Sequence, residues 1–171
     1  MKVTDIPENE YSIFNATYIK AAGEGDLYED LEISLHDFIR FVQDIPMDKF
    51  DFRYAEGKWT IKEIIQHIID TERIFSYRAL RISRNDITAL PGFEQDDYAA
   101  NTEANKRHLQ SLLTELSIVR QSTLALFKSF SEEQIKRIGI ASNNEISVRA
   151  IGFIIIGHQK HHQKVYKERY L

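Results

Sequence analysis

Apolar residues recur along four long stretches of the chain at steps of three and four, the spacing of residues on one face of a helix. The first stretch covers residues 26–45 and ends at Pro46, because proline cannot continue a helix. The later stretches, and a shorter helical segment before the first, cover residues 60–84, 102–130, 146–169 and 11–22. The alternation of apolar and polar residues that marks a strand is almost absent. The pattern therefore predicts an all-α protein, a four-helix bundle with a short N-terminal helical segment.

The predicted helix over residues 60–84 has the clearest beginning. Thr60 as N-cap and Glu63 three residues later form a capping box, and Trp59 and Ile64 occupy the positions of a hydrophobic staple. The first and third helices show the clearest inward-facing stripes, which are Leu27, Leu31, Leu35, Phe38 and Val42, and Leu109, Leu112, Leu116, Val119 and Leu126.

The connections between the predicted helices are long, at about fourteen, seventeen and sixteen residues, where compact bundles usually use two to eight. Long loops at one end of a rigid scaffold often carry binding residues, so residues near Trp59, Phe93, Gln95 and Tyr98 are candidates for the walls of a pocket. The alternatives are that these connections only seal the bundle end or serve as crossovers.

Length and composition indicate one globular domain over residues 1–171, with 43% hydrophobic and 28% charged residues. A net charge of −4 argues against nucleic acid as a partner. The chain has no cysteine, so a metal ion would be held by histidine, carboxylate or water. No signal peptide and no membrane-spanning stretch is evident, and we therefore expect a cytoplasmic protein with no membrane partner.

The predicted C-terminal helix places two histidines on its apolar face. Ile151, Ile155, His158, His162 and Val165 follow one another at steps of four and three. Side chains four residues apart lie one turn apart on the same surface, so both imidazoles can bind one ion at roughly 2.0–2.1 Å. A zinc-like catalytic site usually needs a third protein ligand, for which His67 is the best candidate.

The positions of these histidines along their helices predict the topology. His67 lies about seven residues after the start of its helix and His162 about seven before the end of its own, which is ~10 Å from a helix end in each case. The two histidines lie at the same height along the bundle axis only if these helices run antiparallel. This favours an up-down-down-up order, with residues 85–101 as the crossover.

Each candidate residue has a structural alternative. The three histidines could be core residues, and Asp70, a weak candidate for orienting a ligand or a water, could simply be solvated or ion-paired. His161 points off the apolar stripe, and Glu72 has no functional claim. Three further residues line one side of the second helix near its end, where stabilisation of the helix dipole is favoured over an anion pocket: Arg78, Arg81 and Arg84.

The motifs at the two ends of the helical region resemble those of the DinB-like (DinB/YfiT-like) metalloenzyme superfamily. They are the run Lys58-Trp59-Thr60 with His67 downstream, and the C-terminal run of residues 157–162 that contains His158 and His162. The resemblance covers nearly the whole chain, including the loop of residues 90–93. It implies a four-helix bundle that binds one divalent ion through His67, His158 and His162, and zinc and nickel are the ions most expected there. It also implies low-molecular-weight thiols as cofactors in some members, and a homodimer.

Two hypotheses of function follow. In the first, the protein is an enzyme whose three-histidine ion activates water or a low-molecular-weight thiol against a small-molecule substrate, as a hydrolase or an S-transferase would. In the second, it is a small-molecule-binding or structural protein whose metal only ties helices together. The chain has neither the Glu-x-x-His pattern of ferritin-like di-iron proteins nor the His-Glu-x-x-His pattern of zinc peptidases.

Overall fold

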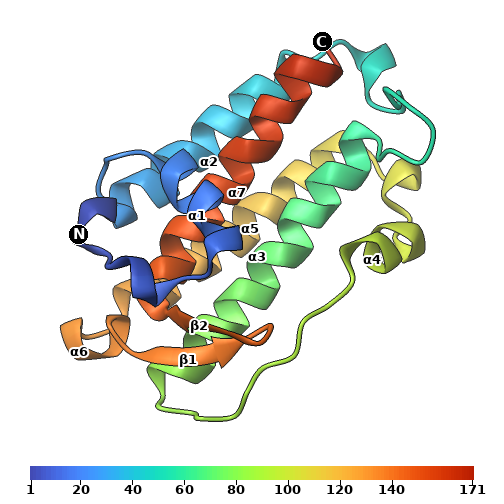
Figure 1. Cartoon of the computed structure of the whole chain (residues 1–171). Coiled ribbons are helices and arrows are strands. Elements are labelled where there is room, and N and C mark those ends of the chain that lie inside the picture. Colours follow the sequence, from blue (N-terminus) through green and yellow to red (C-terminus); the bar gives the residue numbers. More distant parts are fainter.

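Four long helices form the body of the protein, which is described here by a computed structural model covering residues 1–171 (Figure 1). They are α2 (Leu27–Gln43), α3 (Ile61–Ser83), α5 (Leu109–Lys128) and α7 (Val148–Arg169). The predicted four-helix bundle is confirmed. The first, second and fourth helices have the bounds expected from the sequence to within two residues at each end. No helix is both long enough and apolar enough to cross a membrane.

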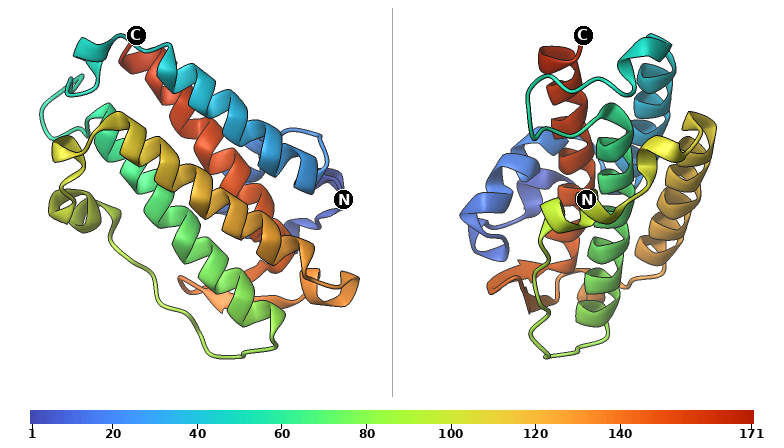
Figure 2. Two further views of the ribbon diagram at one scale, coloured as in Figure 1. Left: turned by 180° about the vertical axis from the view of Figure 1, so that it is seen from behind. Right: turned by 90° about the vertical axis from the view of Figure 1, so that its right-hand side faces the viewer.

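The bundle has the predicted up-down-down-up order. Helices α2 and α7 run in one direction, and α3 and α5 run in the other (Figures 1 and 2). After α3 the chain returns along the outside of the bundle to α4 (Gln95–Asn101), which lies beside the beginning of α3. This crossover makes α3 and α7 antiparallel neighbours.

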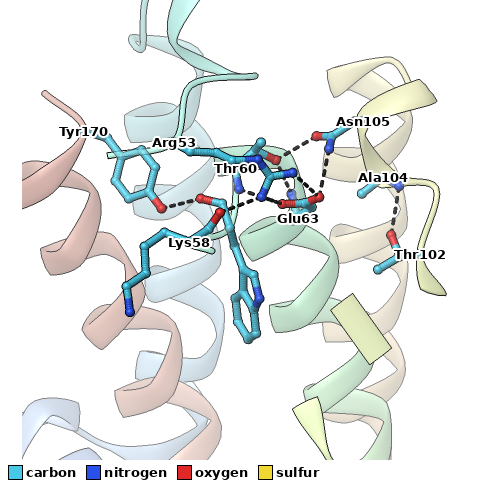
Figure 3. Close-up of polar contacts among 9 residues, drawn as sticks. Arg53, Lys58, Thr60, Glu63, Thr102, Ala104, Asn105 and Tyr170 are labelled. Atoms are coloured by element: carbon cyan, nitrogen blue, oxygen red, sulfur yellow. Dashed lines mark hydrogen bonds and ion pairs between the residues drawn. The ribbon is translucent and has the colours of Figure 1, made fainter. Parts of the chain in front are cut away.

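Side-chain caps fix the beginnings of the helices that carry the histidines. The predicted capping box of α3 is present, because Thr60 Oγ1 accepts from Glu63 N at 3.1 Å and Thr60 N donates to Glu63 Oε2 at 2.7 Å. Ser147 Oγ caps α7 by accepting from Ala150 N at 3.1 Å. Arg53 clamps Glu63 from outside with two hydrogen bonds (Figure 3).

Two hydrophobic clusters fill the two ends of the bundle interior. All five stripe residues predicted in α2 are buried, whereas in α5 the outermost two, Leu109 and Leu126, are only partly buried. Between the clusters lies a polar network that the sequence did not predict. Arg120 of α5 is fully buried and bonds to groups of α2, α3 and α7.

The third predicted helix was wrong at its beginning. Residues 102–130 were expected to be one helix, but α5 begins only at Leu109 and is preceded by α4 and a 3-10 turn, η4 (Ala104–Lys106). Asn105 explains the difference, because its side chain accepts from Thr60 Oγ1 at 2.7 Å and donates to Glu63 Oε1 at 2.9 Å (Figure 3). These contacts to α3 hold residues 104–106 away from the axis of α5.

A small hairpin in the last connection was also not predicted. Strands β1 (Ile138–Ala141) and β2 (Asn144–Ser147) are antiparallel, with Gly139 opposite Ile146, and follow the one-turn helix α6 (Glu132–Ile135). Leu90 of the crossover bonds to both sides of Ala141, through Leu90 N to Ile140 O at 2.9 Å and Ser142 N to Leu90 O at 3.0 Å. The hairpin thus fixes the crossover to the bundle.

The predicted N-terminal segment is α1 (Ile13–Ala22), which packs along α7. Gly157 permits this close approach, because a Cβ atom at that position would lie 1.8 Å from Tyr18 O. Single 3-10 turns occupy the remaining chain, as η1 (Val3–Asp5), η2 (Glu8–Glu10) and η3 (Met47–Lys49).

Candidate metal centre

The structure brings His67, His158 and His162 together where α3 and α7 face each other. His67 Nε2 lies 3.0 Å from His158 Nε2, and His162 Nε2 lies 3.1 Å from the same atom. One nitrogen from each residue falls within 4.8 Å of the others, and no carboxylate belongs to the group. The three positions singled out in the sequence therefore form one cluster.

Helix geometry explains the convergence. His158 and His162 are one turn apart on α7, with ring centroids 4.6 Å apart, and His67 reaches them from the antiparallel helix at 4.9 and 5.0 Å. The rings are held by aromatic neighbours. The indole of Trp59 lies 4.8 Å from the His67 ring, and the Tyr18 ring meets His158 edge-on at 5.3 Å.

The contacts of His158 Nε2 cannot both be hydrogen bonds. An imidazole nitrogen has a single in-plane position, occupied either by a proton or by a lone pair, so it can pair with only one of the two neighbouring nitrogens. The second contact would then set two lone pairs, or two protons, against each other. A cation between the three nitrogens removes the conflict, since all three lone pairs can point at it. Nitrogens around a tetrahedral ion at roughly 2.0–2.1 Å stand roughly 3.3 Å apart, close to the two distances measured from His158 Nε2.

Burial keeps the imidazoles neutral. It lowers the pKa of His67 to about 4, against a smaller opposing effect of the carboxylate of Asp96. Burial also lowers the pKa of His158 and of His162 well below the usual value, and the neighbouring imidazoles lower both further. Neutral imidazoles present lone pairs at pH 7, as a metal ligand must.

The Nδ1 atoms of His67 and His162, which point away from the cluster of Nε2 atoms, have few hydrogen-bond partners. His67 Nδ1 lies 3.4 Å from Thr71 Oγ1, whereas His162 Nδ1 is buried with no hydrogen-bond partner in the protein. Metal-bound histidines usually donate their second N–H to a protein or water acceptor. The protein itself supplies no such acceptor to His162.

Two cavities of about 310 Å³ each open on the cluster. His67 and His158 line the first and His162 lines the second, so the cluster stands between them. As expected, the long connections supply walls, with Phe93 in the first cavity, Trp59 in the second and Gln95 in both. Tyr98 lines neither cavity and packs against Phe93 at 5.1 Å.

Other residues considered from the sequence lie away from the cluster. Asp70 accepts a hydrogen bond from Gln66 Nε2 at 2.9 Å and lies 4.0 Å from Arg73, and none of its hydrogen bonds reaches a histidine. His161 is the exception: it is half-buried beside Tyr18 and meets the His162 ring edge-on at 5.3 Å, without joining the group of three nitrogens. His36 and His108 are exposed on the surface.

The burial of Glu72 was not predicted from the sequence. It is almost completely buried and receives both guanidinium contacts of Arg120, at 2.8 and 2.9 Å. Gln159, next in the chain to His158, also accepts from Arg120, at 2.8 Å. The network thus supports the helix that carries two of the histidines.

Comparisons with known proteins find a similar sequence and a similar fold. The chain is 26% identical over 111 residues to the "Putative metal-dependent hydrolase OB0413" of Oceanobacillus iheyensis, a match covering 64% of this chain and 63% of that protein. The matched region therefore spans less than two thirds of that relative's length. The fold of this chain is similar to that of YfiT from Bacillus subtilis, which is described as a probable metal-dependent hydrolase with an unusual four-helix bundle topology. The TM-score is 0.76, with 16% identity over 95% of this chain and 90% of the other.

The family assignment rests on a longer match. The sequence model of the DinB superfamily matches residues 30–165, a region that holds all four long helices apart from their outermost residues. His67, His158 and His162 all lie within it. The chain belongs to the DinB superfamily.

Proposed function

We propose that His67, His158 and His162 hold one divalent metal ion, zinc or nickel, and that the protein is a metal-dependent enzyme acting on a small molecule. The observation that carries the proposal is the pair of contacts at His158 Nε2, 3.0 and 3.1 Å, which hydrogen bonding alone cannot satisfy. The name of the Oceanobacillus relative and the description of YfiT support it.

A site with three protein nitrogens and no carboxylate leaves the ion its full charge and an open position, as in catalytic rather than structural zinc sites. A divalent ion bound there lowers the pKa of water or of a thiol and so supplies a nucleophile at neutral pH. The reaction is therefore a hydrolysis by water or a transfer to a low-molecular-weight thiol.

The chain's own groups prepare the site for this chemistry. Burial excludes solvent from His158 and keeps its lone pair free of protons. The phenol of Tyr18 on the wall of the first cavity is protonated at neutral pH, as any tyrosine is, and burial raises its pKa further, so it can donate a hydrogen bond to a substrate oxygen.

A structural metal is the second candidate, because the cluster joins α3 to α7 and an ion there would tie the two helices. A measurement of turnover distinguishes a catalytic metal from a structural one. The metal-loaded protein would be tested on ester and amide substrates, and on an electrophile such as chlorodinitrobenzene with a small thiol. An enzyme shows turnover that is lost in His162→Ala and kept in His36→Ala. A structural metal raises the melting temperature while every reaction stays at the background rate. A cytoplasmic location and a homodimer stay predictions.

A further inference from the structure

Arg78 shares the first cavity with the histidines. It lies eleven residues after His67 on α3, three turns further along the helix and ~16 Å in rise. Its side chain is buried, with 6% of the residue exposed, yet it lines the same cavity as His67 and His158. The cavity therefore has a metal-binding end and a cationic end.

The guanidinium of Arg78 has spare donors. Nη2 donates to Pro91 O at 2.8 Å and to Ser142 Oγ at 2.9 Å, which uses two of the five N–H groups of an arginine. Nε and both N–H groups of Nη1 have no hydrogen-bond partner in the protein, and neither nitrogen is sealed from solvent. Pro91 belongs to the crossover and Ser142 to the hairpin turn, so two connections that form the cavity wall hold this side chain in place.

Arg78 differs in this from the other buried arginines. Three arginines are buried, and two of them are paired with a buried carboxylate, Arg120 with Glu72 and Arg149 with Glu10. No carboxylate pairs with Arg78, and its nearest compensation is the ring of Phe75 at 5.8 Å. Burial lowers the pKa of Arg78, with no acidic neighbour to offset the effect.

The surroundings add positive rather than negative potential. The first turn of α1 faces the cavity through Ser12, its N-cap, and Asn15, and the beginning of a helix carries partial positive charge. Glu94 is the one acidic residue in the lining, and it is exposed and forms no ion pair with Arg78. A buried charge without a counterion is costly, which is why such groups are normally paired.

We propose that Arg78 binds an anionic group of the substrate, a carboxylate or a phosphate, while the reacting end of the same molecule lies beside the three histidines. This inference rests on the proposed function and names its substrate class: an elongated small molecule with an anionic end. It departs from the reading of the sequence, which favoured stabilisation of the helix dipole for this residue. Charge-assisted hydrogen bonds from an otherwise unpaired guanidinium supply both affinity and selectivity.

The test uses cobalt(II)-loaded protein and ω-mercapto acids with two to ten methylene groups. Thiolate binding to cobalt produces a charge-transfer absorption, from which a dissociation constant follows without any turnover. Each mercapto carboxylate would be compared with the mercapto alcohol and the mercapto phosphonate of the same length. At one chain length we expect a charged end group to strengthen binding about tenfold or more over the alcohol. Whether the carboxylate or the phosphonate gains more identifies the natural group.

Variants then test whether Arg78 causes the preference for charged probes. In R78M the charged and uncharged probes should bind equally, and R78K should keep part of the preference. R84M, which changes the exposed arginine that follows the last residue of α3, should keep all of it. The cobalt spectrum without thiol shows whether each variant keeps its metal site, and the length scan on the wild-type protein needs no variant. Equal binding of acids and alcohols at every length, or a preference that survives in R78M, overturns the inference. A protein that takes up no cobalt contradicts the proposed function itself, and the inference fails with it.

Discussion

Arg120 of α5 and Glu72 of α3 form a bidentate ion pair inside the bundle, with Nε to Oε1 and Nη2 to Oε2 distances of 2.8 and 2.9 Å. The remaining donors of Arg120 reach Leu31 O and Ser34 Oγ of α2 and Gln159 Oε1 of α7. One side chain thus contacts all three other long helices. Gln159 in turn donates to Ser34 O at 2.6 Å, so that its side chain is fixed at both ends beside His158.

Breaking this pair should be costly. Glu72→Gln leaves a buried guanidinium without its counterion, and we expect the free energy of unfolding to fall by about 3–5 kcal/mol. Urea denaturation followed by circular dichroism measures it. The matched control is Glu133→Gln, which removes an exposed partner of Arg137 and should cost about 0.5 kcal/mol or less. Similar losses in the two variants would show that the buried pair has no special role.

Gly157 should be intolerant of a methyl group. In Gly157→Ala the new Cβ would overlap Tyr18 O at 1.8 Å, so α1 must shift away from α7. We expect a loss of stability of about 1–3 kcal/mol in thermal or urea unfolding. Gly92→Ala is the control, because its Cβ would meet nothing closer than Ser142 Oγ at 3.4 Å. An unchanged stability of Gly157→Ala would mean that the α1 to α7 contact is looser than described.

The metal-free protein should lose stability in mild acid. The pKa of His67 is about 4 in the folded chain, below the ordinary 6.5, so the unfolded chain binds more protons between these values. The stabilisation is fully present above pH 6.5 and declines as the pH falls toward 4. For His67 alone the loss from pH 7.5 to 5 is about 2 kcal/mol. His158 and His162, whose pKa values are also lowered by burial, add to it.

Urea unfolding at the two pH values, with a chelator present, measures this effect. His67→Leu, which keeps an apolar side chain in the same space, should show a smaller decline than the wild type. A stability that does not change between pH 7.5 and 5 would contradict the buried, neutral state of the cluster.

A bound ion should stabilise the fold by mass action. Zinc or nickel at a concentration well above its dissociation constant should raise the melting temperature of the wild type, since the unfolded chain does not hold the three histidines together. His158→Ala should show no such rise, whereas His108→Ala, which changes an exposed histidine, should respond as the wild type does. An equal rise in His158→Ala would place the ion elsewhere on the protein.

Much of the fold and of the site follows from local pattern. The three- and four-residue spacing of Ile155, His158 and His162 was sufficient to place two imidazoles on one buried face. The positions of the histidines along their helices then predicted the antiparallel arrangement, because ligands must be level to meet. These inferences succeeded because each depends on helix geometry alone.

The features that the sequence did not disclose depend on contacts between distant residues. The expected helix over residues 102–130 begins late, at Leu109, because Thr60 and Glu63 bind Asn105, and no local pattern reveals those contacts. Glu72 and Arg120 are charged residues on separate helices, of a type that is usually solvated, and only the assembled bundle shows that they are buried together. The lack of a carboxylate partner for Arg78 cannot be seen in the sequence for the same reason.

The most direct test of the account is the metal content of protein purified without a histidine tag, measured by elemental mass spectrometry. The comparison is between the wild type, the three single variants His67→Ala, His158→Ala and His162→Ala, and the exposed control His36→Ala. The account predicts about one divalent ion per chain in the wild type and the control, and a large loss of metal in each of the three variants. A wild-type protein that stays free of metal after reconstitution with zinc and nickel, or an ion retained in all three variants, would contradict it.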